Sequence, residues 1–322
     1  MLKRFVAMSS KLANQPSRWT FNVGVARSLL ALSCFGTLFF SSLATMIRPG
    51  SGLEPLLCEG ASSLSVWCVV PAAHYELVRI GALLVLAITA SGWRPRLTAI
   101  PLWWILFSNQ ASLTTVDGGD QIASVLALLL LPISLTDPRT WHWQKANLET
   151  ATNRPYLAIL AGVSGAVLQV QVAFIYINAC LSKLSVPEWL DGTAGYYWLQ
   201  DPMFGPAGVL RTLSDALMVH AVPVAAMTWG SLVTEFMLGI ALFLPRRAKS
   251  VLLATGLLFH LGIAVTMGLW SFGFAMWAAL FLYLWPEGNL GARVRSILHS
   301  WRARSDSERD NADEAIRSLR VE

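Results

Sequence analysis

Long apolar runs separated by short basic segments dominate this chain of 322 residues. A helix needs about 20 apolar residues to cross roughly 30 Å of hydrocarbon. Charged residues make up only 13% of the chain, against roughly 25% in soluble domains, so too few charges remain to coat a soluble globule. We therefore expect an all-α fold, a polytopic transmembrane helical bundle of about eight spans at 25–47, 75–92, 97–114, 121–135, 156–183, 219–244, 250–268 and 271–285.

Lys and Arg residues precede the first expected span and follow every second one. Because cytoplasmic loops are enriched in these residues, the pattern predicts a multi-pass protein with cytoplasmic N- and C-termini. The net charge of +5 is explained by this orientation, and no nucleic-acid-binding signature accompanies it. The expected domains are a basic cytosolic tail (1–21), a transmembrane domain (22–288) and a polar cytosolic tail (289–322).

Cys58 and Cys68 fall in the first loop expected outside the cell. That compartment permits a disulfide, which would close a short loop and stabilise it by about 2–3 kcal/mol. The alternative is two free or buried thiols. His74 is the only other soft ligand in that loop, so no metal site is expected.

Ionisable residues inside spans are costly and therefore mark candidate functional sites. Lys183 ends the fifth expected span, and Gln169, Tyr176 and Lys183 are spaced by sevens, so they share one helix face. A partly desolvated lysine can act as a base near neutral pH. The alternative is a lysine that marks the end of a span and extends its ammonium group to the membrane surface.

Glu235 and His260 lie in consecutive expected spans, each about ten residues from the cytosolic edge. Antiparallel spans would bring them to a similar depth of roughly 15 Å, where a Glu–His pair would lower the cost of burying both. Such a pair would serve either as a structural contact between helices or as a proton relay.

Two outer loops carry further candidates. Asp120 is either part of a turn that caps the next helix or a residue at the outer mouth, level with Lys183. Trp189, Tyr196 and Tyr197 belong to an aromatic segment that is either an interfacial belt or the roof of a cavity. An interfacial helix is expected near 209–217.

Six stretches carry a resemblance to a known family, at 25–32, 117–121, 135–139, 176–183, 189–197 and 258–262. They resemble the sporulation-delaying protein B family, bacterial membrane proteins associated with producing a secreted antimicrobial peptide. That family is similar in turn to the horizontally transferred transmembrane (HTTM) domain, whose best-known member is the vitamin K-dependent gamma-carboxylase. In the carboxylase, the proposed base is a lysine that closes a span before a Trp-x-x-Gly segment, a pattern matched by Lys183, Trp189 and Gly192.

The resemblance implies a factor in the bacterial plasma membrane that matures a secreted peptide toxin from its precursor, with a small partner resembling sporulation-delaying protein A. Lys183 and His260 would be catalytic, and Asp120, Trp189, Tyr196 and Tyr197 would bind substrate. Glu235, Tyr176 and Gln169 would form a polar core. Two alternatives are a carboxylase-type membrane enzyme with a quinone-like cofactor, and a non-catalytic export scaffold or immunity protein.

Overall fold

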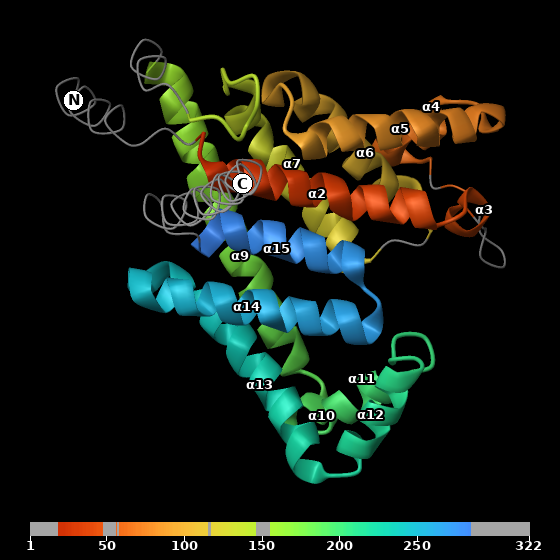
Figure 1. The fold of residues 1–322 in the computed structure, drawn as a ribbon, viewed down its shortest axis with the longest axis vertical. Coiled ribbons are helices and arrows are strands. Elements are labelled where there is room, and N and C mark those ends of the chain that lie inside the picture. Colours follow the sequence, from red (N-terminus) through yellow and green to blue (C-terminus); the bar gives the residue numbers. More distant parts are fainter. Residues whose placement is uncertain (1–18, 48–55, 57, 115–116, 146–154, 285–322) are drawn as a thin grey trace, which may run out of the picture. The chain divides into compact units, whose positions relative to one another are not determined.

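The computed structural model describes residues 19–47, 56, 58–114, 117–145 and 155–284, which form a bundle of helices (Figure 1). The predicted all-α fold is confirmed. In chain order the elements are α2 (Phe21–Phe40), α3 (Leu43–Met46), η1 (Gly60–Leu64), α4 (Val66–Val69), η2 (Ala72–His74), α5 (Tyr75–Ser91), α6 (Pro95–Ser112), α7 (Gly118–Leu135), α9 (Pro155–Lys183), α10 (Pro187–Leu190), α11 (Ala194–Gln200), α12 (Val209–Met218), α13 (Ala221–Gly239), η3 (Ile240–Phe243), α14 (Arg246–Met267) and α15 (Trp270–Leu284).

Six of these helical stretches are long and apolar enough to cross a membrane. They are Phe21–Phe40, Ala72–Ser91, Gly118–Leu135, Ile159–Lys183, Ala221–Phe243 and Arg246–Met267. The other two expected spans correspond to α6, which contains Pro101, and to α15. The 15 residues of α15 reach about 22 Å, less than the thickness of the hydrocarbon core. The prediction of about eight spans is therefore not confirmed.

Local sequence sets several helix boundaries. Asp117 caps α7, because its side chain accepts from the backbone N–H of Gly119 and Asp120. Gly92 and Gly268 follow α5 and α14 at φ angles of 95° and 72°, a left-handed conformation that glycine adopts without strain. These caps satisfy backbone groups that a helix end would otherwise leave unpaired.

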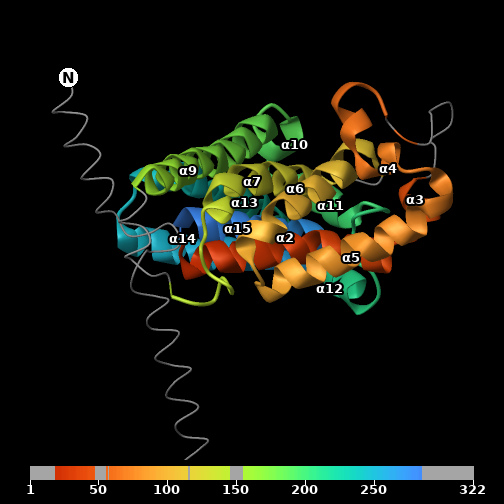
Figure 2. The ribbon, with the colours of Figure 1, turned by 90° about the horizontal axis from the view of Figure 1, so that it is seen from above.

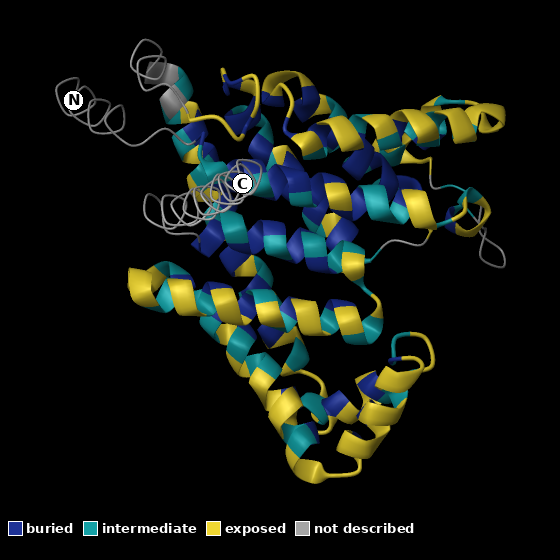
Figure 3. Cartoon of the chain, in the orientation of Figure 1, coloured by how far each residue is buried: buried dark blue, intermediate teal, exposed yellow. Residues whose placement is uncertain are grey.

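The core lies where α15 packs against α2, α7, α9 and α14. Small residues of α15, among them Ala275, Ala278 and Ala279, are fully buried and let neighbouring backbones approach closely. Figure 3 shows buried residues concentrated along α2 and α15, whereas much of α12 and α14 is exposed. The apolar composition of α15 is therefore matched by its burial against four neighbouring helices.

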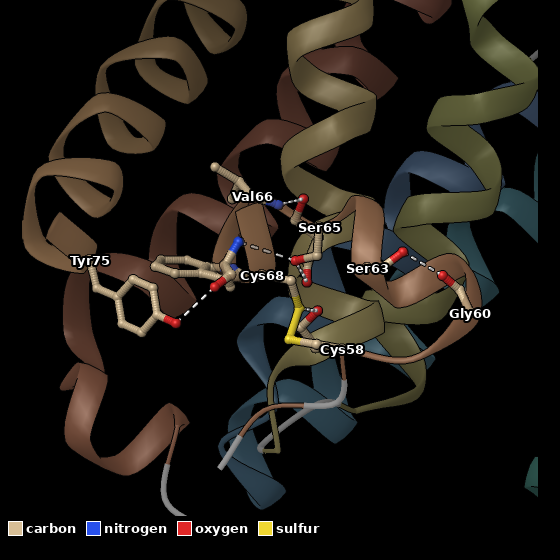
Figure 4. Close-up of a disulfide and its surroundings, with 10 residues drawn as sticks. Cys58, Gly60, Ser63, Ser65, Val66, Cys68 and Tyr75 are labelled. Carbon is tan, nitrogen blue, oxygen red and sulfur yellow. Dashed lines mark hydrogen bonds between the residues drawn. A yellow bond between two sulfur atoms is a disulfide. The ribbon is translucent and has the colours of Figure 1, made fainter. Parts of the chain in front are cut away.

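The short elements between α2 and α5 gather at one end of the bundle, here called the α3 end (Figure 2). There Cys58 and Cys68 form a disulfide with Cα atoms 5.7 Å apart, which confirms the predicted bond (Figure 4). Tyr75 donates to the carbonyl of Trp67 at 2.8 Å, and the indole N–H of Trp67 donates to Asn109 at 2.9 Å. The disulfide loop is therefore anchored to α5 and α6.

The predicted tail 1–21 is described only from Trp19 onwards, and the predicted tail 289–322 lies outside the described residues. Because the model describes neither tail in full, the boundaries of the three expected domains stay a prediction.

Candidate functional site

Helices α9 and α13 bring together the lysine and the glutamate that the sequence singled out. Lys183, the last residue of α9, donates from Nζ to Oε1 of Glu235 at 2.5 Å. The side chain of Glu235 is 9% exposed and that of Lys183 25%. Lys183 therefore takes a carboxylate partner inside the bundle instead of extending to the membrane surface. The alternative of a lysine that only marks the end of a span is disfavoured.

Trp189 completes the surroundings of this lysine. After α9 the chain turns back through two contacts, from Val186 N to Lys183 O and from Trp189 N to Val186 O, each 3.1 Å long. These turns place the indole ring of Trp189 5.2 Å from Lys183 Nζ, a distance at which an aromatic face attracts a cation. The short spacing between Lys183 and Trp189 therefore lets the indole ring lie against the ammonium group.

Tyr176 of α9 and His260 of α14 form a second buried pair. The hydroxyl of Tyr176 lies 3.0 Å from His260 Nε2, and both residues are almost fully buried. Tyr176 precedes Lys183 by seven residues, so the two share the face of α9 that was predicted. We call Tyr176, Lys183, Trp189, Glu235 and His260 the Lys183 cluster.

The pairing within the cluster differs from the expected one. Glu235 was expected to pair with His260, but Glu235 contacts Lys183 and His260 contacts Tyr176. Two buried atoms, Glu235 Oε2 and His260 Nδ1, have no hydrogen-bond partner among the described residues. A buried polar atom without a partner costs free energy unless a water molecule or ligand satisfies it, so both atoms are available to a bound molecule.

Asp120 occupies the first turn of α7, where its carboxylate accepts from the backbone N–H of Asp117 at 3.1 Å. Asp117 in turn accepts from Ser271 at 3.0 Å, which ties α7 to the start of α15. The interpretation of this loop as a helix cap is therefore confirmed. The carboxylate that pairs with Lys183 comes from Glu235, and a substrate-binding role for Asp120 stays a prediction.

The remaining candidates lie at the edge of the cluster or outside it. Tyr196 and Tyr197 are exposed and pack edge to face, with ring centroids 5.6 Å apart. Gln169 is half-buried on α9, and no hydrogen bond joins it to the cluster among the described residues. Contact with substrate remains a prediction for the two tyrosines, as does the polar-core role for Gln169.

Sequence reasoning missed a second polar centre. Arg27 falls inside the first expected span, 25–47, but was not singled out as a buried ionisable residue; in the structure it is fully buried within α2. Its guanidinium donates to Ser134 at 2.6 Å and to Thr98 at 2.7 Å, so it joins α2, α6 and α7. An arginine seven residues into an apolar helix was the signal that could have revealed it.

Beside it, Arg139 and Asp137 form a buried ion pair at 2.7 Å. Arg139 also donates to the backbone carbonyl of His142 at 2.7 Å. Burial lowers the pKa of His142 to about 3, and the charges of Arg27 and Arg139 act in the same direction. Asp137 neutralises Arg139 inside the protein, and Arg27 of α2 bonds to Ser134 near the end of α7. This centre therefore holds the loop after α7 against α2.

This chain is 35% identical to the sporulation-delaying protein SdpB of Bacillus subtilis (strain 168) over 273 residues, which cover 83% of this chain and 82% of that protein. The chain belongs to the SdpB family. It is also 36% identical to the uncharacterized protein YitO of the same organism over 271 residues, which cover 83% of this chain and 86% of YitO. No family model matches the chain, and no solved structure matches it.

Five of the six stretches that carried the SdpB resemblance meet in the two polar centres. Stretches 25–32 and 135–139 supply Arg27, Asp137 and Arg139 to one centre. Stretches 176–183, 189–197 and 258–262 supply most of the Lys183 cluster. This member of the SdpB family therefore joins residues far apart in sequence at two buried sites. The wider likeness to the HTTM domain stays a prediction.

Proposed function

We propose that this chain is a membrane protein required to produce a secreted antimicrobial peptide of the sporulation-delaying type. It would act on the toxin precursor with a small partner resembling sporulation-delaying protein A. The observation that carries this proposal is the 35% identity to SdpB over 83% of the chain. The basic segments support a plasma-membrane protein with both termini in the cytoplasm.

Within this role, the Lys183 cluster is the site where we propose that the precursor is recognised. Lys183 and Trp189 offer a cation and an aromatic face, and Glu235 Oε2 is a buried acceptor without a partner. A peptide amide or hydroxyl group that donates to Oε2 would satisfy this buried acceptor. Since Lys183 Nζ donates to Glu235, the geometry favours binding and positioning over action as a free base.

The second candidate is a carboxylase-type membrane enzyme with a quinone-like cofactor. The observation in its favour is that Lys183 contacts Glu235 and Trp189, while His260 contacts Tyr176 on the same face of α9. Lys183 could donate to a ring oxygen of such a cofactor, Trp189 could contact its ring, and His260 Nδ1 has no other partner among the described residues. When bound, the cofactor would supply redox chemistry that these side chains lack.

The test is to express the precursor and the small partner with this chain and to analyse the secreted peptide by mass spectrometry. Lys183→Ala and His260→Ala are compared with Lys145→Ala, a control that removes an exposed lysine from a loop. We expect the first two variants to lose most of the mature peptide while the amount of protein in the membrane is unchanged. Normal peptide mass and yield from both would show that the site proposal is wrong.

Other outcomes separate the alternatives. If peptide is lost only in proportion to the protein in the membrane, the chain is a scaffold. If cells that express the chain alone resist the mature toxin, it is an immunity protein. A quinone that co-purifies with the wild-type chain and is absent from the Lys183→Ala variant would favour the enzyme.

A further inference from the structure

The connection from α9 to α13 begins deep beside a membrane span. Lys183 pairs with Glu235, which lies fourteen residues into the span Ala221–Phe243, about 21 Å along its axis. Figure 2 agrees, since α10 lies short of the α3 end of the bundle. The chain after Lys183 therefore starts well inside the bundle and runs back along α13 to reach Ala221.

The return path is packed against the interior of the same span. A Cβ atom on Gly192 would lie 3.0 Å from the ring of Trp229, and Gly195 N donates to Thr228 Oγ1 at 2.9 Å. Thr228 is seven residues into the span, about 10 Å along its axis. Because Gly192 and the first turn of α11 contact residues at that depth, this segment lies beside the span and not beyond its end.

Helix α12 leaves an apolar face uncovered by the protein. Arg211 and Asp215 lie 3.2 Å apart and both hydrogen-bond to Gln200 at the end of α11, while their side chains stay 38% and 50% exposed. On another face Val209, Leu213 and Leu217 follow one another at intervals of four residues, and Leu213 is 56% exposed. A helix in water would turn such a row of aliphatic side chains towards the protein.

We propose that 184–219 is a re-entrant segment and that bilayer lipid covers the face formed by Val209, Leu213 and Leu217. Two observations favour lipid over a protein partner. Met218 of α12 packs with Val224 in the first turn of the span, and the exposed apolar surface continues through Val219 to Val222. The exposed aromatic rings of α11 are of the kind that collects at the membrane–water boundary. The Lys183 cluster then lies behind a lipid-facing segment.

The test measures what touches this face in the full-length chain, reconstituted in lipid nanodiscs. Single cysteines at Val209 and Leu213 carry a nitroxide label, and relaxation by oxygen is compared with relaxation by a water-soluble nickel chelate. Val233→Cys, at an exposed position of α13, is the lipid reference, and Lys145→Cys, at an exposed position of the loop after α7, is the water reference. Because Cys34 and Cys180 are buried, the unsubstituted chain serves as the labelling blank.

We expect labels at Val209 and Leu213 to match Val233, with oxygen several-fold more effective than nickel. Labels that match Lys145 would place the face in water and overturn the proposal. Labels that neither reagent reaches would mean that protein covers the face, which overturns it as well. Both substitutions are at exposed apolar positions, and a single gel-filtration peak at the wild-type volume checks that each variant is folded.

Discussion

Lys183 Nζ lies 2.5 Å from Glu235 Oε1, and this contact joins the end of one span to the interior of another. It places the lysine beside Glu235, fourteen residues along α13 from Ala221, and it fixes how far α9 is shifted along its neighbour. The contact therefore accounts for both the re-entrant course of the following segment and the position of Trp189 over the ammonium group.

Removing one partner of this pair should destabilise the protein more than removing both. Lys183→Met leaves a buried carboxylate alone and Glu235→Gln leaves the ammonium alone, so each should cost about 1–3 kcal/mol, less than a fully buried pair because Lys183 is a quarter exposed. The double variant should recover most of that loss. Thermal unfolding in detergent measures the coupling, and additive losses in the double variant would contradict a direct pair.

Tyr176→Phe should destabilise the protein by about 1 kcal/mol, because it removes the hydroxyl group that faces His260 Nε2. Tyr197→Phe removes the same atom from an exposed residue and should leave the unfolding temperature unchanged. The two variants are compared in one detergent at equal protein concentration. Equal shifts would indicate that the Tyr176–His260 contact contributes nothing to stability.

The sequence predicted the buried polar residues better than their partners. An ionisable residue in an apolar run stands out because burial is costly, which is how Lys183, Glu235 and His260 were found. Partners depend on the tilt and relative shift of the helices, and packing determines these. The expected Glu235–His260 pair assumed upright helices of equal depth. Lys183 was placed at an outer mouth for the same reason.

The arginine residues were missed for a different physical reason. Arg139 was read as a loop charge that orients the protein in the membrane, and that interpretation takes the arginine to be hydrated. Arg27, near the start of the first expected span, was not weighed as a buried charge. Hydroxyl groups of Ser134 and Thr98 hold Arg27 from 107 and 71 residues away in the sequence, and Asp137 holds Arg139 from only two residues away, inside a loop. Such pairings carry no periodic pattern that a single sequence would show.

Folding stability should fall as the pH is lowered from 7 to 5, and His142 should contribute to this. Its pKa is about 3 in the folded chain against an ordinary value of 6.5, mainly because of burial. Below pH 6.5 the unfolded chain therefore binds a proton that the folded chain does not bind until about pH 3. The contribution is complete above pH 6.5 and should shrink by about 2 kcal/mol between pH 7 and pH 5.

The measurement for His142 is the unfolding temperature as a function of pH, for the wild-type chain and for His142→Gln. Whatever stability the variant loses at pH 7, its curve should be flatter between pH 7 and pH 5. Curves of equal slope would mean that His142 is protonated in the folded chain at these pH values.

Replacing both Cys58 and Cys68 with serine should destabilise the loop between α2 and α5. The bond closes a loop with a sequence separation of 10, for which the entropy of the unfolded chain predicts about 2–3 kcal/mol. A reducing agent should lower the unfolding temperature of the wild-type chain by a similar amount and leave the double variant unchanged. An equal effect of reductant on both proteins would show that the bond is not its target.

Gly192→Ala should destabilise the re-entrant segment, because two constraints coincide at this residue. Gly192 has a φ of +86°, where a Cβ atom costs about 1–2 kcal/mol, and that atom would lie 3.0 Å from the ring of Trp229. Gly162→Ala is the matched control: it lies within α9 with no neighbouring atom within 4 Å, so alanine should be neutral there or stabilise by up to about 1 kcal/mol. The unfolding temperature should fall for Gly192→Ala and should stay unchanged or rise for Gly162→Ala. If Gly192→Ala also lowers the yield of mature peptide while Gly162→Ala does not, the position of Trp189 beside Lys183 depends on this turn.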